Sequence, residues 1–177
     1  ATAYGTSLGL DSTGLLLALL VTQFVAFPCS IIFGKLSAKF DTGKLIKVCI
    51  VCYTCITLFG TFLASLWQFW VLAVLVGMFQ GGIQALSRSY LGKIIPPEQS
   101  GEYYGLMDIF GKGADAMGPA LIALTTRLMG EKTVTVFGAE LKGQNIGVGG
   151  LVILFAIGFI LFVKADRLNK ARKAAKV

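Results

Sequence analysis

The sequence predicts an all-α membrane protein, a polytopic helix bundle with about five transmembrane helices. Its 177 residues are 55% hydrophobic and only 14% charged, whereas soluble domains average about 25% charged residues. Long apolar runs alternate with short polar segments, and Lys and Arg gather in alternate connections. A chain with so little polar surface is suited to a bilayer.

Five apolar runs are predicted to be the spans. Each comes close to the ~20 residues that a helix needs to cross the hydrocarbon layer. The predicted spans are, approximately, residues 14–34, 45–64, 69–90, 103–126 and 146–163. We expect one membrane domain over residues 1–177, ending in a basic tail at 164–177.

Prolines and a β-like stretch interrupt this pattern. Pro28 predicts a kink in the first span, and Gly118 with Pro119 predicts a bend in the fourth, because proline removes a backbone donor from the helix. The alternation Thr-Val-Thr-Val-Phe at 133–137 predicts a short strand or hairpin in the longest connection, 127–145.

The distribution of basic residues predicts the orientation. Twelve lie in or beside the first hairpin, the second hairpin and the tail, and three lie in the 127–145 connection or beside it. Since Lys and Arg favour cytosolic loops, we expect residues 35–44, 91–102 and 164–177 in the cytosol and 127–145 outside.

Polar side chains form a stripe on each of two neighbouring spans. Residues four apart share one face of a helix, and a charge at mid-membrane costs about 2.5–3.5 kcal/mol on insertion scales. The stripes therefore predict ion pairing or an aqueous cavity. The alternative is snorkelling at helix ends. The stripes consist of Gln80, Gln84 and Arg88 in the third span and Asp108, Lys112 and Asp115 in the fourth.

These six residues are the candidates for solute or proton binding. Asp108 and Lys112 stand in the favourable i,i+4 order, and we expect them to pair. Asp115 is the candidate proton-titrating group, because desolvation raises the pKa of a carboxyl.

Other motifs favour structural roles. Cys49, Cys52 and Cys55 have part of an iron–sulfur spacing, but they lie in an apolar run and lack a fourth cysteine, which favours simple packing. Gly77 and Gly81 form a GxxxG pair typical of close helix contacts.

Several function classes find no support in the sequence. Histidine is absent, so the usual triad base is missing, and we expect no catalytic site, no metal and no cofactor. An intramembrane hydrolase would need a second acidic or nucleophilic motif in another span. The net charge of +7 lies beside apolar runs, which favours membrane topology over nucleic-acid binding.

Residues 81–119 resemble a signature of the major facilitator superfamily. The stretches GGIQALSRS and GLMDIFGKGADAMGP together resemble its vacuole-effluxer-like branch, which is related to autophagy-associated amino-acid effluxers. The hairpin motif of the superfamily matches at Gly34 and Leu36 and departs at Ala38 and Asp41. That departure leaves the charge latch of the motif unsupported in this half.

The resemblance implies that the five spans are helices eight to twelve of a twelve-helix transporter. It implies partners in the lipid bilayer, a missing N-terminal half, a small polar solute such as an amino acid, and protons. It also implies a multi-pass protein of the bacterial cell membrane. The alternative is a non-transporting membrane subunit, a scaffold or a gene remnant, in which the polar stripes only join helices.

Overall fold

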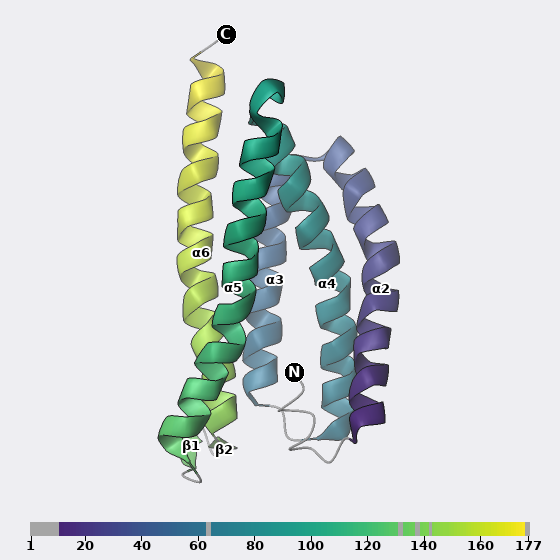
Figure 1. Cartoon of the computed structure of the whole chain (residues 1–177), viewed down its shortest axis with the longest axis vertical. Helices are drawn as coiled ribbons and strands as arrows, with labels where there is room; N and C mark the ends of the chain where they lie inside the picture. Colours follow the sequence, from purple (N-terminus) through teal and green to yellow (C-terminus); the bar gives the residue numbers. More distant parts are fainter. Residues whose placement is uncertain (1–10, 63–64, 131–132, 137–138, 142, 176–177) are drawn as a thin grey trace.

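The computed structural model describes residues 11–62, 65–130, 133–136, 139–141 and 143–175. These residues form five long helices, one short 3-10 helix and a two-stranded hairpin (Figure 1). In chain order they are α2 (Ser12–Lys39), α3 (Thr42–Thr61), α4 (Leu66–Gly92), η1 (Pro97–Gln99), α5 (Ser100–Met129), β1 (Val134–Val136), β2 (Ala139–Leu141) and α6 (Gly143–Ala174).

Each predicted span lies within one helix, apart from the last residues of the second, and most helices extend beyond the apolar run. Polar caps define several of the starts. The Asp11 carboxylate accepts a hydrogen bond from the Gly14 amide at 2.8 Å, and Asp41 accepts one from the Gly43 amide at 2.9 Å. Such caps satisfy backbone donors that a helix leaves free in its first turn.

Membrane character is clearest in four helices. Within the described residues, α2, α3, α4 and α6 are long and apolar enough to cross a bilayer. The 30 residues of α5 are also long enough, but its charged and small residues lower its mean hydropathy. Large apolar side chains face outward, with Phe24 77% and Phe27 71% exposed on α2. Such exposure suits lipid or protein contact, since soluble proteins expose large apolar patches sparingly.

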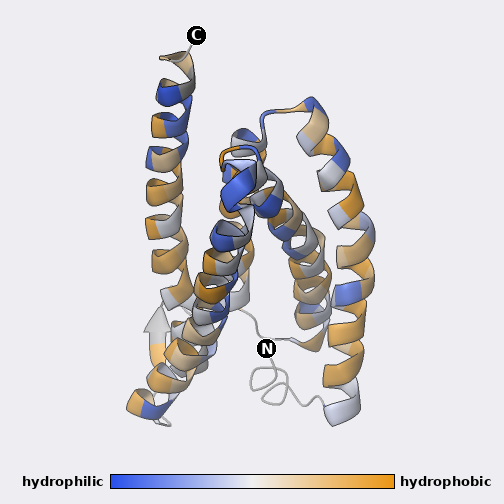
Figure 2. Ribbon diagram, turned by 45° about the horizontal axis from the view of Figure 1, so that its top comes forward, coloured by the Kyte–Doolittle hydropathy of each residue, from blue (hydrophilic) through white to orange (hydrophobic). Residues whose placement is uncertain are grey.

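The helices pack in a chain of neighbours rather than around one centre. α4 packs on α2 and α3, α3 packs on α6, and α6 packs on α5. Consecutive α4 and α5 make few contacts with each other. Figures 1 and 2 show α5 leaning across the bundle and separating from α6 toward the end of the bundle that holds the chain's C-terminus. We call the side of α4 that carries Gln84 and Arg88 its open side, because a groove runs along it and few contacts join it to α5.

Glycines allow α4 to approach α2 closely. A Cβ on Gly77 would lie 2.6 Å from the carbonyl oxygen of Thr22, and one on Gly81 would overlap the carbonyl of Ala26. Neither position has room for a side chain without a shift of the α2 backbone. Leu86, Ile46 and Cys49 form the buried core between α4 and α3.

The two ends of the bundle differ in chemistry. The basic end holds the α2–α3 turn, the α4–α5 connection and the C-terminus, and hydrophilic residues are concentrated there (Figure 2). The opposite, hairpin end holds β1 and β2, paired antiparallel with Val134 opposite Leu141. The predicted hairpin in the 127–145 connection is thus confirmed.

The structure adds detail to two features expected from the sequence. α6 extends into the predicted basic tail and continues as a helix to Ala174, where Asp166 and Lys170 bond to the other helices. Pro28 and Pro119 both lie inside continuous helices, and the kink at Pro28 and the bend at Gly118 and Pro119 stay predictions.

Candidate functional site

The site that the structure forms on the open side of α4 is centred on an ion pair between α4 and α5. The Arg88 guanidinium donates a hydrogen bond to the Asp108 carboxylate, with an Nη2–Oδ1 distance of 2.8 Å. The Arg88 side chain is 56% exposed and that of Asp108 is 51% exposed. The Tyr104 hydroxyl of α5 also donates to the Arg88 carbonyl oxygen at 3.0 Å. These bonds join two helices that otherwise scarcely touch.

The expected pair between Asp108 and Lys112 is not formed. Asp108 turns to Arg88 on the neighbouring helix instead, since a guanidinium can reach across the gap and present several donors to a carboxylate. Lys112 and Asp115 are both exposed on α5. Within the described part of the chain, neither has a hydrogen bond or ion pair.

A groove between α2 and α4 leads up to Arg88. Its open volume is about 490 Å³, and the polar groups along it come from both helices. The residues that line it are Gln23, Ala26, Phe27, Ser30, Gly81, Gln84, Ala85 and Arg88. Two members of the predicted α4 stripe, Gln84 and Arg88, therefore share one surface with polar groups of α2.

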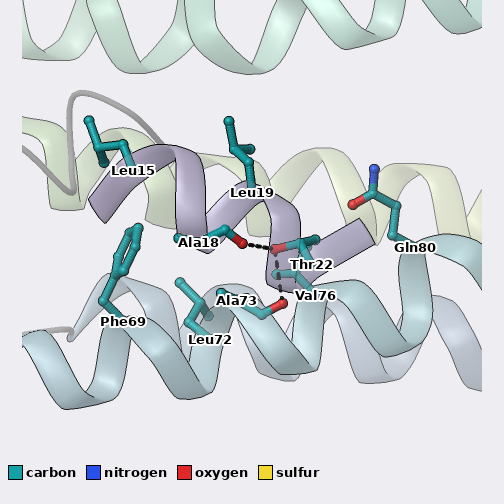
Figure 3. A pocket seen from close by; sticks show the side chains of 9 residues that line it. All are labelled: Leu15, Ala18, Leu19, Thr22, Phe69, Leu72, Ala73, Val76 and Gln80. Atoms are coloured by element: carbon teal, nitrogen blue, oxygen red, sulfur yellow. Dashed lines mark hydrogen bonds between the residues drawn. The ribbon is translucent and has the colours of Figure 1, made fainter. Parts of the chain in front are cut away.

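Gln80, the third member of that stripe, lies in a separate pocket nearer the hairpin end. This pocket has a volume of about 190 Å³ and is largely apolar, with Leu15, Leu19 and Phe69 among its walls (Figure 3). The Thr22 hydroxyl donates to the carbonyl of Ala18 at 2.8 Å and lies 3.3 Å from that of Ala73. The amide of Gln80 is the group left to meet a polar ligand there.

The position of the Arg88–Asp108 pair decides what it can do. Arg88 lies four residues before the end of α4 and Asp108 eight residues after the start of α5, which is about 6 Å and 12 Å along the helices. Charges half exposed at that depth are costly if lipid surrounds them. They are better accommodated beside water, another protein segment or a polar solute.

A second charged cluster lies at the basic end, and the sequence did not predict it. The Asp166 carboxylate of α6 is 1% exposed and accepts hydrogen bonds from Lys47 at 2.5 Å and from the Tyr90 hydroxyl at 3.0 Å. Lys170 lies 3.2 Å from the same carboxylate and 2.6 Å from that of Asp41. The sequence feature that could have indicated this cluster is Asp166, an acidic residue in a basic stretch, one helical turn before Lys170.

The electrostatics of the α2–α3 turn follow from this cluster. The hydrogen bond from the Lys170 ammonium holds the pKa of the Asp41 carboxyl below its ordinary value of 3.8. The Gly43 amide acts in the same direction, and partial desolvation opposes both. Asp41 therefore remains ionised at neutral pH and keeps its cap on α3.

The side chains that could ligate a metal are spread over the described helices. Among the described residues, no three Cys, Asp or Glu side chains come together around a common point. The four cysteines are free thiols, and Cys49, Cys52 and Cys55 follow one another along α3, with Cys49 buried in the core.

Several long apolar helices with large exposed apolar side chains are typical of polytopic integral membrane proteins, and this chain has both. The chain belongs to the vacuole effluxer Atg22-like family, whose model matches residues 1–175.

Individual relatives agree with this family. The chain is 44% identical over 161 residues to the Bacillus subtilis protein named "Uncharacterized MFS-type transporter YxiO", covering 91% of this chain and 35% of the relative. It is 30% identical over 107 residues to autophagy-related protein 22 of Coccidioides immitis, covering 60% and 16%. It thus spans about a third or less of each of these relatives. No solved structure matches the chain.

Proposed function

We propose that this chain is the C-terminal part of a secondary active transporter that moves a small polar solute across a membrane by alternating access. Membership of the Atg22-like family and similarity to a protein named as an MFS-type transporter support the transporter class. The sequence resemblance suggests amino acids as the solute. The rest of the transporter, including an N-terminal half, would lie against the open side of α4.

The observation that carries this proposal is the half-exposed Arg88–Asp108 pair beside the α2–α4 groove. A guanidinium offers donors to a carboxylate or phosphate group, and a carboxylate accepts hydrogen bonds from an ammonium or hydroxyl group. Gln84 adds an amide in the same groove. A small solute that carries both donors and acceptors fits this set of groups.

Alternating access then requires the pair to change partners. When a solute binds Arg88 or Asp108, it competes with their mutual hydrogen bond and weakens the link between α4 and α5. A ligand shifts a conformational equilibrium only through such a difference in affinity between states. Asp115 is the proposed proton acceptor, since it lies seven residues after Asp108 on α5 and has no hydrogen bond or ion pair within the described residues.

A transport assay on the intact protein tests the proposal. The full-length transporter is reconstituted in liposomes, and uptake and efflux of radiolabelled amino acids are measured with and without a proton gradient. We expect transport of at least one solute to exceed that of empty liposomes and to fall in Arg88→Gln. Full transport in Arg88→Gln would remove Arg88 from the site.

A non-transporting membrane subunit or scaffold is the second candidate. It is favoured by one feature, that the Arg88–Asp108 and Tyr104–Arg88 bonds join helices that have few other contacts. In that case the polar stripe serves assembly alone. No solute in the panel would be transported, while Arg88→Gln and Asp108→Asn would still lower stability.

We further propose a bacterial cell membrane as the location, with the basic end in the cytosol. The excess of Lys and Arg at that end supports this orientation.

A further inference from the structure

The buried carboxylate of Asp166 joins three helices at one point. It lies on α6, accepts the Tyr90 hydroxyl of α4 at 3.0 Å and accepts Lys47 of α3 at 2.5 Å. A Cβ on Gly43 would fall 2.5 Å from Asp166 Oδ1, so the start of α3 packs directly on the carboxylate. No part of the proposed solute site uses this residue.

Further bonds extend this junction to α2. Lys170 binds Asp41 at 2.6 Å, and Asp41 in turn caps α3. Lys93, just after α4, donates to the Ser37 carbonyl of α2 at 2.9 Å and to the Thr42 hydroxyl at 2.7 Å. The basic ends of α2, α3, α4 and α6 are therefore connected by charge-assisted hydrogen bonds, which are about twice as strong as neutral ones.

α5 stands outside this network. None of its residues is buried, and at the basic end its polar bonds to the other long helices are the half-exposed Arg88–Asp108 pair and the Tyr104–Arg88 bond. At the hairpin end it packs tightly on α6, where a Cβ on Gly147 would lie 2.8 Å from Ile122 Cα and one on Gly143 2.9 Å from Thr126 Cα. Figure 1 shows the two helices parting toward the basic end.

From this contrast we infer that Asp166 is a positioning residue that holds α2, α3, α4 and α6 together as one rigid unit, against which α5 moves separately. α5 pivots on its tight contact with α6 at the hairpin end. It is released at the basic end when Arg88 and Asp108 part. The link between this motion and solute binding rests on the proposed function, whereas the rigid unit and the moving helix do not.

Distances between spin labels in the intact protein test this inference without any solute. Unnatural amino acids at exposed positions carry the labels, so the native cysteines stay in place. The pair Lys39–Leu168 reports within the rigid unit, from α2 to α6, and the pair Tyr103–Leu168 reports from α5 to the unit. All three sites are exposed.

In Asp108→Asn, we expect the Tyr103–Leu168 distance to change by about 5 Å, roughly one helical turn, while Lys39–Leu168 stays narrow and unchanged. In Asp166→Asn, we expect the Lys39–Leu168 distribution to broaden. Lys170→Gln should broaden it too, and this variant removes an exposed side chain that is 47% accessible. If Asp166→Asn does not accumulate, Lys170→Gln decides the question.

Two controls separate loss of the junction from other effects. Glu98→Gln removes an exposed carboxylate that has no ion pair within the described residues, and both distances should match the wild type. Phe69→Leu weakens the separate core cluster between α2 and α4, which contains no junction residue, and Lys39–Leu168 should stay narrow below its unfolding temperature.

The inference is overturned if Asp108→Asn moves both label pairs equally. It is also overturned if neither Asp166→Asn nor Lys170→Gln broadens Lys39–Leu168. A protein that transports no solute but gives the expected distances would contradict the proposed function and leave the rigid unit intact.

Discussion

At the residue scale, Arg88 and Asp108 have the strongest claim to a functional role. An exposed ion pair contributes about 0–1 kcal/mol to stability, whereas breaking a buried pair costs about 3–5 kcal/mol. Both side chains are more than half exposed, so the structure places this pair in the weaker class. A large functional effect from these residues would therefore not be explained by loss of stability.

We predict that Arg88→Gln and Asp108→Asn each lower transport by about tenfold or more while changing the free energy of unfolding by at most ~1 kcal/mol. Transport in liposomes and thermal unfolding in detergent measure the two effects. Lys112→Gln is the matched control, since Lys112 has no partner within the described residues. Equal losses in all three variants would show that charge on α4 and α5 matters without a specific pair.

Asp41 gives the protein a stability term that depends on pH. Its pKa is lower in the folded protein, chiefly because Lys170 donates a hydrogen bond to it. A depressed carboxyl pKa stabilises the fold above the ordinary value of 3.8, and this stabilisation is lost as the pH falls through the folded value.

We therefore predict that Asp41→Asn flattens the dependence of the unfolding temperature on pH below about pH 4. The measurement is a series of thermal melts in non-ionic detergent, with Glu98→Gln as the control that keeps the wild-type slope. If the Asp41→Asn and wild-type profiles have the same slope, Asp41 contributes nothing to the acid response.

At the scale of elements, the packing of α4 on α2 depends on glycine. Replacing Gly by Ala inside a helix usually stabilises it by about 0.5–1 kcal/mol, because glycine loses more backbone entropy on folding. The Gly81→Ala substitution should instead destabilise the protein, because the added Cβ would overlap the Ala26 carbonyl. Gly105 of α5 has nothing within 4 Å of its Cβ position.

We predict that Gly81→Ala lowers the unfolding temperature and that Gly105→Ala leaves it unchanged or raises it. Both substitutions add one methyl group inside a helix, so their difference reports the contact with α2. Similar unfolding temperatures for the two variants would mean that α2 and α4 can separate at little cost.

At the scale of the whole molecule, the two ends of the bundle should face different compartments. The α2–α3 turn, the α4–α5 connection and the end of α6 share the basic end, while β1 and β2 lie at the other end. The excess of Lys and Arg at the basic end predicts that it is cytosolic.

We predict that, in intact cells, a membrane-impermeant maleimide labels Thr133→Cys and does not label Leu168→Cys. Both sites are exposed, and permeabilised cells provide the control in which both react. Labelling of Leu168→Cys alone in intact cells would invert the topology.

Much of the fold could be predicted from local sequence properties. Apolar runs and their charged ends predicted five helices, and the alternation at 133–137 predicted the hairpin. These features depend on hydropathy and on side-chain period along the chain, which each segment carries by itself. The polar stripes on α4 and α5 were visible for the same reason.

Local sequence properties were enough to predict the membrane class, the helices and which helix faces are polar. The pairing of Asp108 with Arg88 rather than Lys112, and the burial of Asp166 among α3, α4 and α6, became visible in the packed structure alone. Ion pairing depends on the distances between helices, and those distances follow from how all the helices pack together. The paired residues are far apart in the chain, as with Lys47 and Asp166, which are separated by 119 positions, and no local pattern encodes such distances.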